Sequence, residues 1–368
     1  MSTIDRLDRQ PTELIVTWTD GIVSHYPWLW LRDHAHDEAT LHPVTQQRQL
    51  YTAAVSPAIE AIDVGFTSAS VDIIWRDEPV SSLPIEFLIR FRQPEPAMVR
   101  VHAERKLWDA RSVHPTPSVP FDDIMSSDVG VAAWLGKVAA YGFCIASGTP
   151  ASTTATEQLV QRVAYVRETI FGGFWEFTAD LSKADTAYTN LELRPHTDGT
   201  YSHDAPGLQL LHCLEFDGDG GESTMVDGFR LAAELRTRVP RLHEVLSTVP
   251  VPGQYIGDGA HLMSARPVLR HDHGGTLVQV SFNNADRAPF LLPADEMTEL
   301  YDALRAFDLL ANDQSFQWRH VLRPGDALLF DNWRVLHGRT AYTGRRRLCG
   351  AYLNHEDFES RLRLLETY

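Results

Sequence analysis

The sequence RPHTDGTY, residues 194–201, decides how this chain is interpreted. His196 and Asp198 are two positions apart, so on an extended strand their side chains point to the same side. A histidine and a carboxylate placed in this way can be two of the three ligands of a 2-His-1-carboxylate iron site. His337, in the sequence DNWRVLHGR, is the predicted third ligand. We predict that these residues bind a catalytic metal ion; the alternative is that they are ordinary polar residues on turns.

A second His-x-Asp pair, at His355 and Asp357, does not fit such a site because of its position in the chain. The site needs another histidine on a later strand, and the chain has none after Asp357. The pair at His196 and Asp198, in contrast, is followed by His337. Only the earlier pair is therefore expected to bind the metal ion.

A run of three arginines, Arg345 to Arg347, follows about nine residues after His337 at the start of a strand pattern. A guanidinium group binds a carboxylate through two parallel hydrogen bonds, which suits the far carboxylate of 2-oxoglutarate. The alternation of a strand turns Arg346 inward and its neighbours outward. We predict that Arg346 binds this cosubstrate; the alternative is a solvated basic run.

The composition describes an ordinary globular protein. The composition is 43% hydrophobic and 22% charged, and the length of 368 residues favours two structural units. The net charge of −16 repels phosphate backbones and anionic lipids, so we expect neither nucleic acid nor membrane partners. No signal peptide is expected, and three scattered cysteines indicate a reducing compartment. A reducing compartment fits a cytoplasmic protein, and the excess of arginine over lysine suggests the GC-rich genome of a bacterial source.

The pattern of elements changes near residue 105. Before it, short strand patterns predominate, including a predicted hairpin over residues 14–26. After it, periodicity predicts helices over residues 122–141, 154–169 and 295–310, and strands over residues 207–213, 277–282, 327–330 and 348–353. Many short strands with few helices predict an α+β fold, mainly β, with a sheet sandwich or barrel.

Several ordered motifs resemble one known family. They are FGGFWEF, DTAYT, HTDGTY, LQLLHCLE and GGESTMVDGF between residues 171 and 229, and DNWRVLHGRTAYTG and RRLCGAYL near the end, together with WLRDH and TQQR near the front. This set resembles the γ-butyrobetaine/trimethyllysine dioxygenase family of Fe(II)/2-oxoglutarate-dependent oxygenases, which has a taurine dioxygenase-like catalytic domain.

The resemblance implies a double-stranded β-helix (jelly roll) catalytic domain over residues 106–368, behind a small β-rich N-terminal domain over residues 1–105. It implies Fe(II), 2-oxoglutarate and O2 as cofactor and cosubstrates, with the predicted triad as iron ligands. Ser223 falls where the family has a serine or threonine near the cosubstrate; the alternative is a turn hydroxyl. The family is often dimeric, so a homodimer is left open.

The N-terminal domain departs from the family in one respect. Family members often hold a structural zinc ion there with three cysteines and one histidine. The corresponding positions here are Ala35, Asp37, Thr40 and Pro79. We therefore expect no zinc ion and interpret this segment as a polar loop.

Four aromatic residues stand where the family encloses a trimethylammonium group: Phe171, Trp175, Tyr188 and Tyr352. A quaternary ammonium cannot donate a hydrogen bond, so cation–π attraction and apolar contact must hold it. The sequence therefore predicts a small trimethylammonium substrate. The alternative for each aromatic residue is simple core packing.

Asp185 distinguishes between the candidate substrates, because γ-butyrobetaine dioxygenases have Asn at this position and trimethyllysine dioxygenases have Asp. Asp185 would repel a bare carboxylate but would pair with the α-ammonium of trimethyllysine, whose carboxylate could meet Arg287, with Asn284 and Tyr201 as further candidates. We rank Nε-trimethyllysine first, then 2-(trimethylammonio)ethylphosphonate and γ-butyrobetaine. A sulfonate oxygenase and a non-catalytic cupin-like binding protein are the remaining alternatives.

Overall fold

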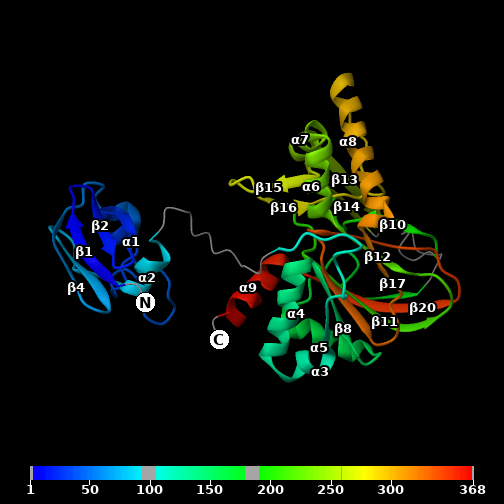
Figure 1. Ribbon diagram of the computed structural model, residues 1–368, viewed down its shortest axis with the longest axis horizontal. Helices are drawn as coiled ribbons and strands as arrows, with labels where there is room; N and C mark the ends of the chain where they lie inside the picture. Colours follow the sequence, from blue (N-terminus) through cyan, green and yellow to red (C-terminus); the bar gives the residue numbers. More distant parts are fainter. Residues whose placement is uncertain (1–2, 93–104, 179–189, 258, 367–368) are drawn as a thin grey trace. The chain divides into compact units, whose positions relative to one another are not determined.

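The computed structural model describes residues 3–92, 105–178, 190–257 and 259–366. The chain divides into two compact units, residues 1–100 and 101–368 (Figure 1). Each unit is described separately below.

The N-terminal unit is built from two three-stranded antiparallel sheets, β1-β2-β3 and β4-β5-β6. Their strands are β1 (Ile4–Arg9), β2 (Glu13–Trp18), β3 (Val23–Pro27), β4 (Ala61–Phe66), β5 (Ser70–Trp75) and β6 (Ser81–Pro84), with helices α1 (Trp28–Asp33) and α2 (Ile85–Arg90). Alternate residues of β2 and β5, such as Val16 and Ile73, share one hydrophobic core. The turn between β2 and β3 contains Gly21, whose φ of 83° suits a residue without a Cβ.

Two sheets form the centre of the second unit. The larger has the strand order β7-β8-β18-β11-β20-β9 and the smaller β10-β19-β12-β17. The strands are β7 (Ser118–Pro120), β8 (Phe143–Ser147), β9 (Phe174–Thr178), β10 (Leu193–His196), β11 (Leu208–Asp217), β12 (Ser223–Asp227), β17 (Gln317–His320), β18 (Asp326–Asp331), β19 (Val335–Arg339) and β20 (Arg345–Leu353). Neighbouring strands are far apart in sequence, as in a jelly roll.

The alternation of side chains along the strands separates two hydrophobic cores. Phe143 of β8 and Phe330 of β18 face the smaller sheet, in a core that also contains Met225. The residues next to them, Cys144 and Leu329, pack instead against helices. The larger sheet is therefore buried on both faces.

Helices cover the outer faces of both sheets (Figure 1). The larger sheet packs against α3 (Phe121–Ser126), α4 (Asp128–Tyr141), α5 (Thr153–Val163) and α9 (His355–Glu366). The smaller sheet packs against α6 (Gly228–Arg238), α7 (Pro240–Thr248) and α8 (Ala294–Asn312). Among the described residues, none of the helices combines the length and the apolar character needed to cross a membrane.

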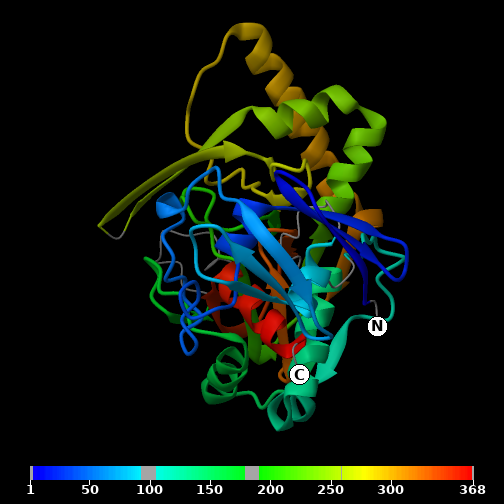
Figure 2. The same ribbon diagram turned by 90° about the vertical axis from the view of Figure 1, so that its left-hand side faces the viewer.

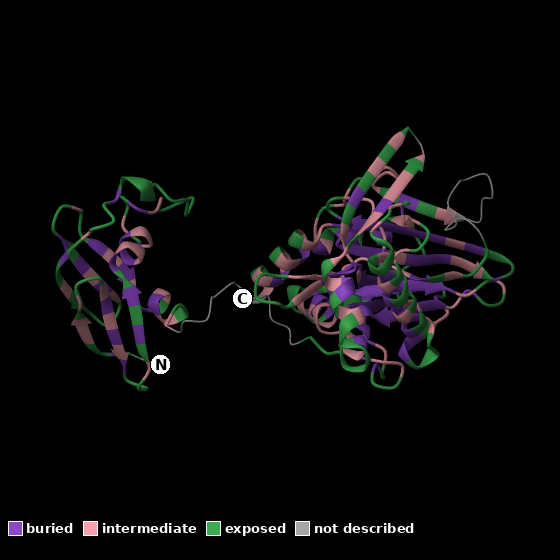
Figure 3. Ribbon diagram, turned by 90° about the horizontal axis from the view of Figure 1, so that it is seen from above, coloured by how far each residue is buried: buried purple, intermediate pink, exposed green. Residues whose placement is uncertain are grey.

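A two-stranded hairpin, β13 (Pro250–Gly257) and β14 (Ala260–Pro267), extends from the second unit (Figure 2). Most of its residues are exposed or half-buried, unlike the central strands (Figure 3). A shorter pair, β15 (Leu269–His271) and β16 (Leu277–Val280), follows it. The sequence patterns predicted β16 but not the hairpin, whose polar and apolar residues do not alternate strictly.

The helix expected over residues 122–141 is in fact two helices, α3 and α4, which are separated at Ser127. The Ser127 hydroxyl accepts a hydrogen bond from the backbone N–H of Gly130 and so begins α4 as an N-cap. The apolar periodicity continues through both helices, because both pack on the same sheet. Periodicity alone therefore hid the break.

Candidate active site

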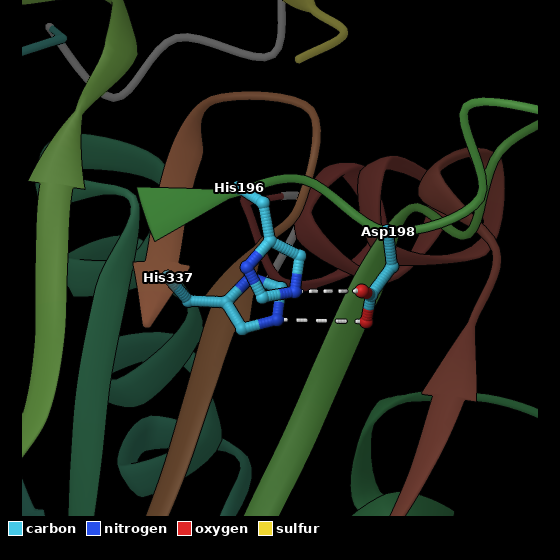
Figure 4. A group of neighbouring side chains, drawn as sticks. All are labelled: His196, Asp198 and His337. Atoms are coloured by element: carbon cyan, nitrogen blue, oxygen red, sulfur yellow. Dashed lines mark ion pairs between the residues drawn. The ribbon is translucent and has the colours of Figure 1, made fainter. Parts of the chain in front are cut away.

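The predicted metal ligands meet where β10 lies beside β19. His196, the last residue of β10, pairs directly with His337 of β19, and their ring centroids are 4.4 Å apart. Asp198 follows β10 by two residues and faces both rings (Figure 4). Its Oδ1 lies 3.4 Å from His196 Nε2, and its Oδ2 lies 3.5 Å from His337 Nε2. The strand pairing thus brings together His196 and His337, which are 141 positions apart in sequence.

The chemistry of these side chains fits a metal ion. The ligand atoms all lie within 4.8 Å of one another, and no other such group occurs among the residues that the structure describes. The Nδ1–H of His196 donates to the Arg194 carbonyl at 2.8 Å, so Nε2 is the ring nitrogen that faces Asp198. Burial acts to raise the pKa of Asp198, but His337 and His196 lower it well below its usual range. The carboxylate is therefore ionised, as a metal ligand must be.

Asn332, which the sequence did not single out, holds the backbone of Asp198. Its Oδ1 accepts a hydrogen bond from the Asp198 N–H at 2.8 Å, and its Nδ2 donates to the Asp198 carbonyl at 3.1 Å. Nδ2 also donates to the Pro206 carbonyl at 2.9 Å. Asn332 is buried, so its side chain fixes the turn that presents the Asp198 carboxylate.

Tyr352 of β20 contacts the same carboxylate. Its hydroxyl donates a 2.8 Å hydrogen bond to Asp198 Oδ2, while its ring lies 5.8 Å from that of Trp175. Trp175 of β9 lies opposite Gly350, and a Cβ at Gly350 would collide with the Trp175 ring and with the Leu210 carbonyl. The absence of a side chain at Gly350 therefore allows the indole to lie over the sheet.

Arg346 lies near the start of β20, on the same face of the strand as Tyr352. It is buried, whereas Arg345 is exposed and Arg347 pairs with Glu215. Among the described residues no carboxylate lies within ion-pair distance of Arg346, whose guanidinium instead stacks over Tyr342 at 5.7 Å. Burial, and secondarily Arg339, lower the pKa of Arg346 to about 10. A buried cation without an anionic partner fits a site for an anionic ligand.

Ser223, at the start of β12, is buried and is the register partner of Arg339 on the neighbouring strand β19. Both residues border the cavity that also contains Arg346. Arg339 was not singled out from the sequence, although its position two residues after His337 on one strand places both side chains on the same face.

One cavity of about 910 Å3 is lined by the metal ligands together with Trp175, Tyr352, Ser223, Arg339 and Arg346. The described residues that were predicted from the sequence and that line it are Phe171, Trp175, His196, Asp198, Tyr201, Ser223, Asn284, Arg287, His337, Arg346 and Tyr352. Asp185 and Tyr188, also predicted, lie outside the described residues.

The aromatic residues of the cavity form two groups. Trp175 lies beside Tyr352, whose hydroxyl reaches Asp198. Phe171 and Tyr201 lie instead against Tyr255 of hairpin β13–β14, at centroid distances of 5.7 and 5.3 Å. The sequence did not predict Tyr255, because the hairpin that carries it was not recognised. Phe171 therefore lies with Tyr201 and Tyr255 rather than in ring contact with Trp175.

Arg287 and Asn284 belong to a loop that is joined to the hairpin. Arg287 forms a backbone bridge with Gly253 of β13, and its guanidinium lies 5.5 Å from the ring centre of Tyr301. Asp286, beside it, accepts a hydrogen bond from Thr200 at 3.2 Å. The loop thus presents both a cation and a carboxylate to the cavity.

In the N-terminal unit, hydrogen bonds connect two of the positions where the family has zinc ligands. The Thr40 hydroxyl donates to Asp37 at 2.9 Å and accepts from the buried Arg32 at 2.6 Å. Arg32 also pairs with Glu78 at 3.2 Å. The expectation that this segment holds no zinc ion stays a prediction.

Comparison with protein families gives two matches. Residues 106–352 match the family described as taurine catabolism dioxygenase TauD, TfdA family, and residues 5–90 match the family described as γ-butyrobetaine hydroxylase-like, N-terminal. Among solved structures, the non-heme iron oxygenase OrfP in complex with Fe, succinate and (3S)-hydroxy-L-Arg has a TM-score of 0.50 and 14% identity, over 65% of this chain and 95% of that one. This likeness concerns the fold alone.

Several curated proteins are similar over nearly the whole chain. Trimethyllysine dioxygenase of Meyerozyma guilliermondii is 36% identical over 95% of this chain and 92% of its own length. The human mitochondrial trimethyllysine dioxygenase is 34% identical over 93% of this chain and 83% of its own. γ-Butyrobetaine dioxygenase of Pongo abelii is 30% identical over 95% of this chain and 93% of its own.

These relatives contradict the expectation of a cytoplasmic, bacterial protein. They come from yeast and mammals, and the mammalian trimethyllysine dioxygenases are named as mitochondrial. The bacterial source had been inferred from the excess of arginine over lysine, and the cytoplasmic location from the cysteines. Arginine and lysine are both solvated cations on a protein surface, so their ratio does not identify the source.

Proposed function

Because the chain belongs to the γ-butyrobetaine/trimethyllysine dioxygenase family, and is thus an iron- and 2-oxoglutarate-dependent dioxygenase, we propose that it hydroxylates Nε-trimethyllysine. The observation that carries the proposal is a single cavity in which a His-Asp-His cluster, a buried arginine and several aromatic rings meet. The trimethyllysine dioxygenases matched at 34 to 36% identity support this substrate over γ-butyrobetaine, whose dioxygenase matches at 30%.

His196, Asp198 and His337 would hold the iron ion, and Arg346 with Ser223 would hold the far carboxylate of 2-oxoglutarate. Iron with bound 2-oxoglutarate supplies the activation of dioxygen that oxidises a C–H bond. The protein supplies position, because binding both ends of the substrate decides which carbon faces the metal. The buried Arg346 is suited to this task, since its lost hydration is restored only by an anion.

Trp175 and Tyr352 would contact the trimethylammonium group, since Tyr352 reaches the metal ligand Asp198 and the Trp175 ring lies 5.8 Å from that of Tyr352. Phe171 and Tyr201, which lie against the hairpin, would border the substrate further out. Arg287 would pair with the substrate carboxylate, with Asn284 beside it. Asp185 and Tyr188 keep their predicted roles at the α-ammonium and in the aromatic cage. We also propose that residues 1–105 form a separate β-rich domain.

The test is 2-oxoglutarate-dependent succinate formation by the Fe(II) protein with Nε-trimethyllysine, γ-butyrobetaine and 2-(trimethylammonio)ethylphosphonate in parallel. We expect the highest kcat/KM with trimethyllysine. Asp185→Asn should shift the preference away from α-amino acids, because it removes the charge that pairs with the ammonium. Coupled turnover with either other compound alone would reject trimethyllysine as the substrate.

A further inference from the structure

Arg32 of the N-terminal unit is a buried arginine in the last turn of helix α1. Its side chain is 2% exposed. Its Nη1 donates to the Thr40 hydroxyl at 2.6 Å, and its Nε donates to the Glu78 carboxylate at 3.2 Å. Thr40 donates in turn to Asp37 at 2.9 Å. A continuous chain of hydrogen bonds, the Arg32 link, therefore runs from the loop after α1 to the turn between β5 and β6.

The Arg32 link passes through or next to the positions that correspond to the zinc ligands of the family. Structural zinc takes four thiolate, imidazole or carboxylate ligands, and neither Ala35 nor Pro79 carries such a donor. The Thr40 hydroxyl is already bonded to Arg32 and Asp37. Asp37 Oδ2 is buried and has no hydrogen-bond partner among the described residues, but one carboxylate oxygen is not a zinc site. The nearby guanidinium would also repel a second cation.

The histidines of the same loop do not supply the missing ligands. The His34 ring stacks on Trp30 at a centroid distance of 4.7 Å, and its Nδ1 lies 2.9 Å from the Trp30 carbonyl. The His36 ring lies 4.8 Å from that of Phe87, and Nδ1 of His42 accepts hydrogen bonds from two backbone N–H groups. Within the described ranges, the one group of three or more metal-ligating side chains belongs to the second unit.

We propose that the Arg32 link takes the place of a structural zinc ion, so that the N-terminal unit keeps its fold without a metal. A zinc ion at the family positions would hold the loop after α1 against the β5–β6 turn, and the link joins the same two segments. Arg32 and Glu78 have opposite charges and Arg32 is buried, so breaking the pair leaves a buried charge without this partner. The inference concerns the N-terminal unit and does not depend on the proposed function.

The first test removes metals from the full-length protein with pyridine-2,6-dicarboxylate. Hydrogen–deuterium exchange, measured by mass spectrometry, then reports on peptides that cover residues 33–41 and 77–84. We expect the same exchange in both segments before and after the chelator, because hydrogen bonds rather than a metal hold them. Exchange that rises with the chelator and recovers with Zn2+ but not with Fe2+ would overturn the inference.

The second test removes the guanidinium. Arg32→Met keeps an apolar stem and loses both hydrogen bonds of Arg32. We expect exchange in both segments to rise at least about tenfold, because segments that lose a buried link open locally more often. Glu78→Gln removes only the charge of the partner and should raise exchange by a smaller factor. That variant decides the outcome if Arg32→Met does not fold.

The matched control is Arg76→Met, which breaks an exposed ion pair beside the same turn. Arg76 donates two 2.8 Å hydrogen bonds to Glu60, and both side chains are more than half exposed. Exposed pairs contribute little, so exchange in both segments should stay within about twofold of the wild type. Wild-type exchange in both Arg32→Met and Glu78→Gln would show that the Arg32 link does not hold the unit together, and would overturn the inference.

Discussion

The hydroxyl of Tyr352 donates a 2.8 Å hydrogen bond to Oδ2 of Asp198, a carboxylate that also faces two histidine rings. The two residues are 154 positions apart in sequence. The bond connects the aromatic lining of the cavity to the candidate metal ligand. A substitution at Tyr352 is therefore expected to change both the affinity for iron and the affinity for the substrate.

Tyr352→Phe separates these two effects, because it keeps the ring and removes only the O–H donor. We expect iron affinity to fall about tenfold, the lower end of the effect of removing an outer partner of a metal ligand. An Fe(II) titration in the presence of 2-oxoglutarate, followed by visible absorption, measures it. Tyr141→Phe, away from the cavity, is the control. Unchanged iron affinity with a raised substrate KM would limit Tyr352 to the substrate.

Asn332→Ala removes the clamp on the Asp198 backbone and leaves an N–H and two carbonyl groups without this partner. We expect the free energy of unfolding to fall by about 1–3 kcal/mol and iron affinity to fall at least tenfold. Asn332→Asp should not restore either quantity, because a carboxylate cannot donate to the two carbonyls. Denaturant unfolding and the same iron titration measure these effects.

The control for Asn332→Ala is Asn312→Ala. Among the described residues, the Asn312 side-chain amide donates to Asp308 within helix α8. This variant should leave iron affinity at the wild-type value. If Asn332→Ala binds iron as the wild type does, the Asp198 turn is held by its own backbone and the clamp is unimportant.

Gly350→Ala should displace the Trp175 indole, because the added Cβ would collide with this ring and with the Leu210 carbonyl. We expect a stability loss of at least about 1–3 kcal/mol and a larger rise in substrate KM than in the Kd of iron. Gly136→Ala is the matched control, since a Cβ there meets no other atom within 4 Å. That variant should be stabilised by roughly 0.5–1 kcal/mol, because alanine favours a helix. An unchanged KM in Gly350→Ala would show that the ring need not lie where it does.

His355, at the start of α9, should make stability depend on pH. Burial alone would lower its pKa, but the charge of Asp331 and hydrogen bonds to Asp331 and Glu359 raise it to about 9. The folded pKa exceeds the unfolded value of about 6.5, so the stabilisation is fully present below pH ~6.5 and is lost as the pH rises through about 9. The full effect is roughly 3 kcal/mol.

Melting temperatures between pH 6 and pH 10 measure this effect. The wild type should lose stability across that interval, whereas His355→Gln should start lower and change less. His203→Gln, at an exposed site, should follow the wild-type profile. Parallel profiles of wild type and His355→Gln would show that the pair with Asp331 does not hold a proton in the folded protein.

The sequence and the structure agree best where a single strand decides the outcome. The spacing of His196 and Asp198, and the alternation that buries Arg346 between Arg345 and Arg347, follow from the geometry of one extended segment. The predictions of a mainly β fold and of the family are supported by the matched relatives and family models. The break at Ser127 and hairpin β13–β14 were missed, because one depends on a cap and the other on a partner strand.

The sequence by itself determined which side chains could bind a metal ion and its cosubstrate, since these depend on residue type and on positions two or a few apart. Only the tertiary structure decided what surrounds them. Asn332 reaches Asp198 across 134 positions, and Tyr352 donates to the same carboxylate across 154. Such contacts depend on which strands become neighbours and in what register, and no local pattern carries that information.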